Sequence, residues 1–173
     1  MTEGLVQVFT GRGKGKTTAA LGTALRALGQ GLKVHIISFM KGDYPYGEYA
    51  TLQYLPSVTV AKFGRIDFVD PENVLDIDRE EAKKALEAAR EATGSGKYDL
   101  VILDEVNIAA AWGLLALDDV IELIRGKPSN VELILTGRYA APELIEVADL
   151  VTEMTEVKHP YQQGIKARCG FEY

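Results

Sequence analysis

Short runs of apolar residues alternate along the chain with longer segments in which apolar positions recur at helical spacing. The short runs predict β-strands at residues 5–10, 33–39, 58–62, 99–104, 131–136 and 150–154. The longer segments predict α-helices at residues 17–28, 78–92, 118–124 and 142–148, and residues 40–48 are predicted to form a loop. Apolar strands separated by helices favour an α/β fold with a mostly parallel sheet and helices on both faces.

A glycine-rich loop stands between the first predicted strand and the first predicted helix. Its glycines allow backbone N–H groups to turn toward one anion, and the start of the helix adds a partial positive charge. The Lys16 ammonium can reach bound phosphates, and the Thr17 hydroxyl can ligate Mg²⁺. The residues of this segment predicted to bind a nucleotide are Thr10, Gly11, Arg12, Gly13, Lys14, Gly15, Lys16, Thr17 and Thr18.

The loop departs from the usual Walker A pattern, G-x-x-x-x-G-K-[ST], at one position. That pattern places a glycine five residues before Gly15, where this chain has Thr10, and the first glycine follows one place later. The alternative is a flexible lysine-rich turn, which does not explain why Lys-Thr-Thr stands at the start of a helix. The pattern therefore predicts a phosphate-binding loop in a P-loop NTPase-like (RecA-like) fold.

Two further polar motifs follow apolar strands, so they are predicted to lie at the same edge of the sheet as the loop. The first is Asp104-Glu105, where a carboxylate can hold Mg²⁺ directly or through water, opposite the Thr17 hydroxyl. In the alternative interpretation these acids only cap the next helix. Because the motif accompanies a phosphate loop, the metal interpretation is favoured.

The second motif is Thr136-Gly137-Arg138. The Arg138 guanidinium offers a forked donor that suits phosphate oxygens, and the alternative is a surface arginine paired with an acid such as Glu143. Lys41, after the second predicted strand, is either a site residue or a solvated lysine. Trp112 lies among alanines and is predicted to serve packing rather than ligand binding.

Composition and charge narrow the class of protein. The 173 residues, 47% of them hydrophobic, suit one domain (1–173) with a substantial core. A formal charge of −6 argues against nonspecific binding of nucleic acid. A single cysteine, Cys169, excludes an intramolecular disulfide. Without a long apolar run or a signal-peptide pattern, the chain is predicted to be cytoplasmic with no membrane partner.

Several motifs together resemble one family. Residues 8–20 resemble the opening of the P-loop ATP:corrinoid adenosyltransferases, which act on cob(I)alamin and on cob(I)yrinic acid a,c-diamide. The resemblance continues in order over nearly the whole chain, through residues 39–42, 45, 47–48, 103–105, 136–138, 157–159, 164–167 and 170–173. The displaced first glycine of the loop is the form found in this family.

The resemblance implies transfer of the 5′-deoxyadenosyl group of ATP to the cobalt of a Co(I) corrinoid, in adenosylcobalamin synthesis or salvage. Cobalt attacks the 5′ carbon of ATP and expels inorganic triphosphate, unlike phosphoryl transfer, in which phosphorus is attacked. No general base is needed, because the metal is the nucleophile. By this resemblance Lys16, Glu105 and Arg138 are the catalytic residues, and Thr17 and Glu105 hold Mg²⁺.

The resemblance also implies features of substrate binding and partners. Arg26 is expected near the nucleoside, and Phe68 is the candidate aromatic beneath the corrin that removes the lower axial ligand and eases reduction to Co(I). A tryptophan found near that phenylalanine in some relatives is absent from this chain. A flavoprotein reductant and a homodimer are further expectations.

Two other functions remain open on the residues alone. One is a P-loop ATPase or kinase in which Glu105 polarises water or a substrate hydroxyl, since an acid beside a Walker B aspartate suits hydrolysis. The other is a regulatory module that binds ATP without turnover. The products separate the three readings: triphosphate with adenosylcorrinoid, phosphate or ADP, or nothing.

Overall fold

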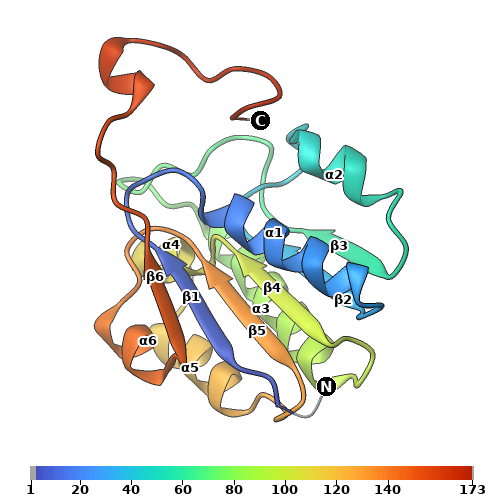
Figure 1. Cartoon of the computed structure of the whole chain (residues 1–173). Coiled ribbons are helices and arrows are strands. Elements are labelled where there is room, and N and C mark those ends of the chain that lie inside the picture. The colour runs from blue at the N-terminus through green and yellow to red at the C-terminus, as the bar shows by residue number, and fades with distance from the viewer. Residues whose placement is uncertain (1–2, 173) are drawn as a thin grey trace.

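The computed structural model describes residues 3–172 and has an α/β fold built on one parallel sheet (Figure 1). Neighbouring strands follow the order β3-β2-β4-β5-β1-β6, and every neighbouring pair is parallel. The strands are β1 Val6–Thr10, β2 Val34–Ser38, β3 Val58–Lys62, β4 Leu100–Asp104, β5 Glu132–Thr136 and β6 Leu150–Glu153. The predicted fold and all the predicted strands are therefore confirmed, with ends that differ by one residue at most.

Helices cover both faces of the sheet, with α1 and α2 on one face and α3 to α6 on the other (Figure 1). Their bounds are α1 Lys16–Gly29, α2 Gly47–Leu52, α3 Asp76–Gly94, α4 Val106–Ala111, α5 Leu117–Arg125, α6 Pro142–Val147 and the 3-10 helix η1 Pro160–Gln163. Helices α2, α4 and η1 were not predicted, and α2 begins inside the predicted loop 40–48. All three are short, so they give little periodicity to read.

The core explains why the strands read as continuous apolar runs. Along β4, Leu100 and Ile102 pack on the side of α1, whereas Val101 and Leu103 pack on the side of α3 and α5. All five residues of this strand are buried. A strand buried on both faces has no polar side, so its sequence shows no alternation.

The topology brings the polar motifs to one rim. Strand β5 lies between β1 and β4, and its Thr136 is paired with Phe9 of β1. The loop after β1, the Asp104-Glu105 motif and Thr136 therefore lie together at the carboxyl ends of the strands. After β6 the chain crosses above this rim, as the red segment of Figure 1 shows. Within residues 3–172, no helix combines the length and apolar character needed to cross a membrane.

Candidate active site

The glycine-rich loop joins β1 to α1, and its own lysine bridges two of its carbonyl oxygens. Lys16 Nζ donates to the carbonyl oxygens of Gly11 at 2.9 Å and Gly13 at 2.8 Å. Gly15 caps α1 with φ +119°, in the left-handed region that favours glycine. Burial lowers the pKa of the Lys16 ammonium, and Arg138 adds to this, against the raising effects of Glu105 and Asp104. Within residues 3–172 Lys16 forms no ion pair, and a bound polyanion would supply an anionic partner.

The loop also packs tightly against the chain that follows β6. The Gly13 N–H donates to the Met154 carbonyl at 2.7 Å, and a Cβ on Gly13 would lie 2.8 Å from the same oxygen. Glycine is required here because the two backbones approach too closely for a side chain. The loop is thereby fixed to the point where the chain turns over the site.

Asp104 is the centre of a buried polar cluster at the end of β4. Its Oδ1 accepts hydrogen bonds from the hydroxyls of Thr17 at 2.8 Å and Thr136 at 2.6 Å, and its Oδ2 accepts from Lys41 Nζ at 2.6 Å. Its side chain is 2% exposed and that of Lys41 is 10% exposed. Burial alone would raise the pKa of Asp104, but the Lys41 charge and these hydrogen bonds hold it below its usual value. Lys41 is therefore a partner of the site and not a solvated surface lysine.

Glu105 has a different environment although it is the next residue. Its backbone adopts φ +66°, and its N–H donates to Thr136 Oγ1 at 3.0 Å. Its carboxylate accepts no hydrogen bond from residues 3–172, and it makes no capping hydrogen bond to α4, which it precedes. Burial, and then the charge of Asp104, raise the pKa of Glu105. The capping alternative therefore fails, and Glu105 presents to the site a carboxylate that has no hydrogen-bond donor within residues 3–172.

These groups face a pocket of about 770 Å³ above the loop. The predicted residues that line it are Arg12, Gly13, Lys14, Gly15, Lys16, Thr17, Thr18, Glu105 and Arg138. The side chain of Arg138 makes no hydrogen bond or ion pair within residues 3–172, so the predicted alternative pairing with Glu143 is not present. The pocket thus combines the glycine-rich loop and several cationic side chains with the carboxylates of Glu48, Glu105 and Glu172.

Comparison with known proteins shows which family the chain belongs to. The family described as ATP:corrinoid adenosyltransferase BtuR/CobO/CobP matches residues 2–173. The chain is 35% identical over 170 residues to the corrinoid adenosyltransferase of Escherichia coli K12, covering 98% of this chain and 86% of the relative. It is 38% identical over 170 residues to that of Pseudomonas aeruginosa, covering 98% and 84%, and 37% identical over 174 residues to that of Sinorhizobium, covering 99% and 81%. The chain belongs to the ATP:corrinoid adenosyltransferase family.

An aromatic and apolar pocket of about 370 Å³ adjoins the nucleotide pocket of this adenosyltransferase. Phe68, the predicted corrinoid residue, lines it and is 76% exposed, so it is not an ordinary core aromatic. Trp112, predicted only as packing, lines the same pocket from the end of α4 while also packing against the core. Four residues line both pockets: Lys41, Tyr46, Glu105 and Arg138.

Three of the predicted nucleotide residues do not line either pocket. Thr10 is buried, and its hydroxyl accepts a hydrogen bond from the Ala140 N–H at 3.1 Å, which ties β1 to the loop carrying Arg138. Gly11 serves as an acceptor for Lys16. Arg26 stands near the far end of α1, ten residues or about 15 Å from Lys16 along the helix, and lines a separate surface depression with Asp99. The structure does not bring Arg26 to the other site residues.

The sequence left one site residue, Lys41, open between two interpretations and missed another, Tyr46. Lys41 reaches Asp104 because β2 is the neighbour of β4, with Ser38 opposite Asp104 in the register. Tyr46 stands at the start of α2 and contacts Lys41, whose Nζ lies 4.8 Å from the centre of the tyrosine ring. The signals for Lys41 were its position after a strand end and the resemblance of residues 39–42, and no pattern singled out Tyr46.

Proposed function

We propose that this chain transfers the 5′-deoxyadenosyl group of ATP to the cobalt of a Co(I) corrinoid and releases triphosphate. The observation that carries the proposal is that the phosphate-loop pocket and the aromatic pocket share Lys41, Tyr46, Glu105 and Arg138. A nucleotide held by the loop would have its nucleoside near a surface suited to the face of a large ring. Family membership supports the same reaction.

The residues of the loop and its surroundings would stabilise the leaving group. When cobalt bonds to C5′, the bond from C5′ to the ester oxygen breaks and its electron pair leaves with triphosphate, while Co(I) is formally oxidised by two electrons. Lys16, Arg138 and the backbone N–H groups of the loop would neutralise the growing charge. No residue needs to remove a proton, so a general base is not required.

The residues present also fit Mg²⁺. Magnesium prefers oxygen ligands and is held in such sites by few protein groups together with phosphate oxygens. Thr17 offers a hydroxyl, and the Glu105 carboxylate has no hydrogen-bond donor of its own within residues 3–172. Asp104 contacts Thr17 directly and would orient it. Bound Mg²⁺ would neutralise charge on the triphosphate.

The corrinoid would lie across the aromatic pocket. Phe68 is exposed at its edge and would exclude a lower axial ligand from cobalt, which favours Co(I). The natural substrate would be cob(I)alamin or cob(I)yrinic acid a,c-diamide. A flavoprotein would supply the electron that converts Co(II) to Co(I), and the enzyme would act as a homodimer.

The test is an anaerobic assay with Mg²⁺-ATP and chemically reduced cob(I)alamin, followed by the visible spectrum and by identification of the phosphate product. Light-sensitive adenosylcorrinoid with stoichiometric triphosphate is the expected result. Unchanged corrinoid with accumulation of ADP and phosphate would instead identify an ATPase. A parallel reaction with reduced cobyrinic acid a,c-diamide distinguishes a precursor substrate from the complete one.

A further inference from the structure

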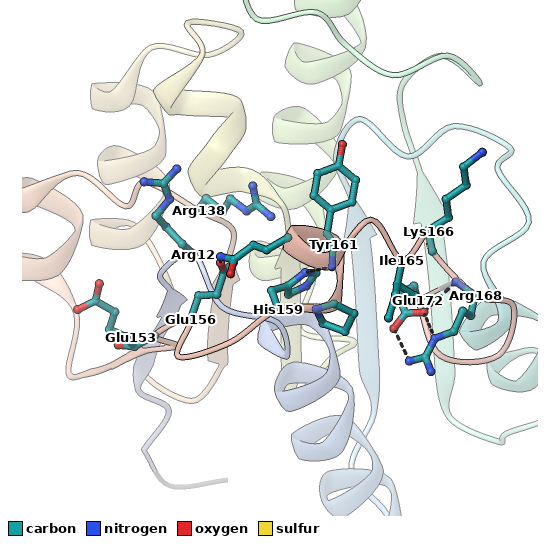
Figure 2. A pocket seen from close by; sticks show the side chains of 14 residues that line it. Arg12, Arg138, Glu153, Glu156, His159, Tyr161, Ile165, Lys166, Arg168 and Glu172 are labelled. Atoms are coloured by element: carbon teal, nitrogen blue, oxygen red, sulfur yellow. Dashed lines mark hydrogen bonds and ion pairs between the residues drawn. The ribbon is translucent and has the colours of Figure 1, made fainter.

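The segment after β6 forms a second wall of the site. Residues 155–172, here called the C-terminal arm, enclose a pocket of about 800 Å³ together with Arg12 and Arg138 (Figure 2). Four residues of the arm, His159, Gly170, Phe171 and Glu172, line the nucleotide pocket. The arm therefore faces the loop from the side opposite the sheet.

A single lysine of the glycine-rich loop makes the polar contacts that join the arm to the rest of the chain. Within residues 3–172, every hydrogen bond and ion pair that joins the arm to the rest of the chain involves Lys14, which donates to the Phe171 carbonyl and to Glu172 at 2.8 Å. Glu172 also accepts from the backbone N–H and the guanidinium of Arg168. Those contacts close residues 168–172 into a hook, and Lys14 holds the hook against the loop.

His159 is the arm residue best placed to contact a bound polyanion. It lines both the arm pocket and the nucleotide pocket, in each case together with Arg12 and Arg138. Its Nδ1 accepts a hydrogen bond from the Tyr161 N–H at 3.2 Å, so this nitrogen carries no proton. The ring is thereby assigned as the tautomer with hydrogen on Nε2, which makes no hydrogen bond within residues 3–172.

The cations around His159 point to the same kind of ligand. Like Arg138, Arg12 makes no side-chain hydrogen bond or ion pair within residues 3–172. Arg12, Arg138 and His159 thus line both pockets together with the Glu172 carboxylate, and Figure 2 shows all four at the arm pocket. Phosphate oxygens are the acceptors that such donors bind best.

We infer that His159 is a further triphosphate-binding residue, which donates a hydrogen bond from Nε2 to the triphosphate. The ion pair between Lys14 and Glu172 positions it. The inference rests on the proposed function, because it assigns the leaving group of that reaction to this donor. The inference adds a contact from the C-terminal arm to the triphosphate contacts proposed for the loop.

The first test measures binding of inorganic triphosphate, by calorimetry in the presence of Mg²⁺ and without corrinoid. His159→Ala is expected to weaken binding about tenfold, which corresponds to about 1.4 kcal/mol. His159→Asn keeps an acceptor for the Tyr161 N–H but has no group at the Nε2 position, so it should behave as the alanine variant does. His159→Gln restores an amide donor near that position and should recover most of the affinity.

A neighbouring charge provides the control. Lys158 is exposed and lines neither pocket, so Lys158→Ala should change the affinity for triphosphate less than twofold. Equal losses in the Lys158 and His159 variants would reduce the effect to general electrostatic attraction and overturn the inference. Unchanged affinity in His159→Ala would also overturn it.

A double-mutant cycle tests whether the ion pair between Lys14 and Glu172 positions His159. If Glu172 positions His159 through Lys14, His159→Ala should have much less effect on triphosphate affinity in a Glu172→Ala background than in the wild type. Additive effects of the two substitutions on triphosphate affinity would show that Glu172 does not position His159. These assays contain no corrinoid, so they test the inference separately from the proposed function. An enzyme that binds triphosphate normally but forms no adenosylcorrinoid would refute the proposed function instead.

Discussion

The buried pair between Lys41 and Asp104 makes a quantitative prediction about stability. Lys41→Met removes the ammonium but keeps most of the apolar stem, and it leaves the Asp104 carboxylate buried with two hydroxyl donors. Breaking a buried ion pair from one side costs about 3–5 kcal/mol. Because the Thr17 and Thr136 hydrogen bonds remain, we expect the lower end, a loss of about 3 kcal/mol. For a chain of this length that lowers the melting temperature by about 6–12 °C.

The pH dependence of this loss follows from the two pKa shifts. The pKa of Asp104 is held below its usual value, so its contribution to stability is present above the unfolded pKa and is lost as pH falls through the folded one. The pKa of Lys41 is raised by Asp104 despite burial, so its contribution is complete below its unfolded pKa and is lost as pH rises through the folded one. The difference between wild type and variant should be largest near neutral pH and shrink toward acid.

Urea denaturation followed by circular dichroism measures the loss at neutral pH and in steps toward acid. The control is a cycle with Asp104→Asn, because a variant that lacks both charges has no unpaired buried ion. We expect the double variant to be more stable than the sum of the single losses indicates, by about 2 kcal/mol. A Lys41→Met loss below about 1 kcal/mol with no coupling to Asp104 would mean that the pair is solvated, and the reasoning would be refuted.

Three further variants test the site. Lys16→Ala should abolish most turnover and weaken binding of Mg²⁺-ATP while the circular dichroism spectrum stays native; turnover at the wild-type rate would refute the loop assignment. Glu105→Gln should raise the melting temperature without ligand at neutral pH, since the raised pKa of Glu105 makes its ionisation unfavourable to folding as pH rises, and this gain should shrink toward acid. The substitution should also weaken the Mg²⁺ dependence of ATP binding. A melting temperature at or below that of wild type would contradict the conclusion that the Glu105 carboxylate has no donor within residues 3–172. Phe68→Ala should slow adenosylation from Co(II) much more than from pre-reduced Co(I), whereas Tyr54→Ala, an aromatic that is 81% exposed and lines no pocket of the site, should affect neither; equal losses from both cobalt states would remove the proposed role of Phe68.

Local sequence was sufficient for the strands and for the place of the glycine-rich loop between β1 and α1. Strand β4 is buried on both faces and therefore stands out as an apolar run, and the loop is a continuous segment whose glycines and lysine act together. Helix α4 escaped prediction because Glu105 turns the chain with φ +66° and the helix begins at once, without a glycine or proline to mark the boundary. Helix α2 is equally short, and tertiary contacts of Leu52 with the core stabilise it.

The contacts that complete the site depend on strand order, which no local pattern contains. Asp104 and Lys41 are 63 residues apart and meet only because β2 and β4 are neighbours. The distance of Arg26 from the loop follows from the length of α1, which a resemblance of positions alone does not reveal. Likewise, the sequence around Phe68 lacks the tryptophan found in some relatives. Nothing in it indicated that Trp112, at the end of α4, would line the same pocket.

The chemistry of the second pocket distinguishes transfer to a corrinoid from ordinary phosphoryl transfer. A hydroxyl acceptor of a kinase, or an attacking water, needs a polar surface beside the phosphates. Here the adjoining pocket is formed mainly by aromatic and aliphatic side chains, among them Phe39, Phe68, Ile108 and Trp112. At about 370 Å³ it is small, but exposed Phe68 and Tyr139 extend its rim, so a ring system would lie across its mouth with one face against these side chains. A broad apolar face beside a triphosphate site fits an acceptor that is a macrocycle and a nucleophile that is its metal.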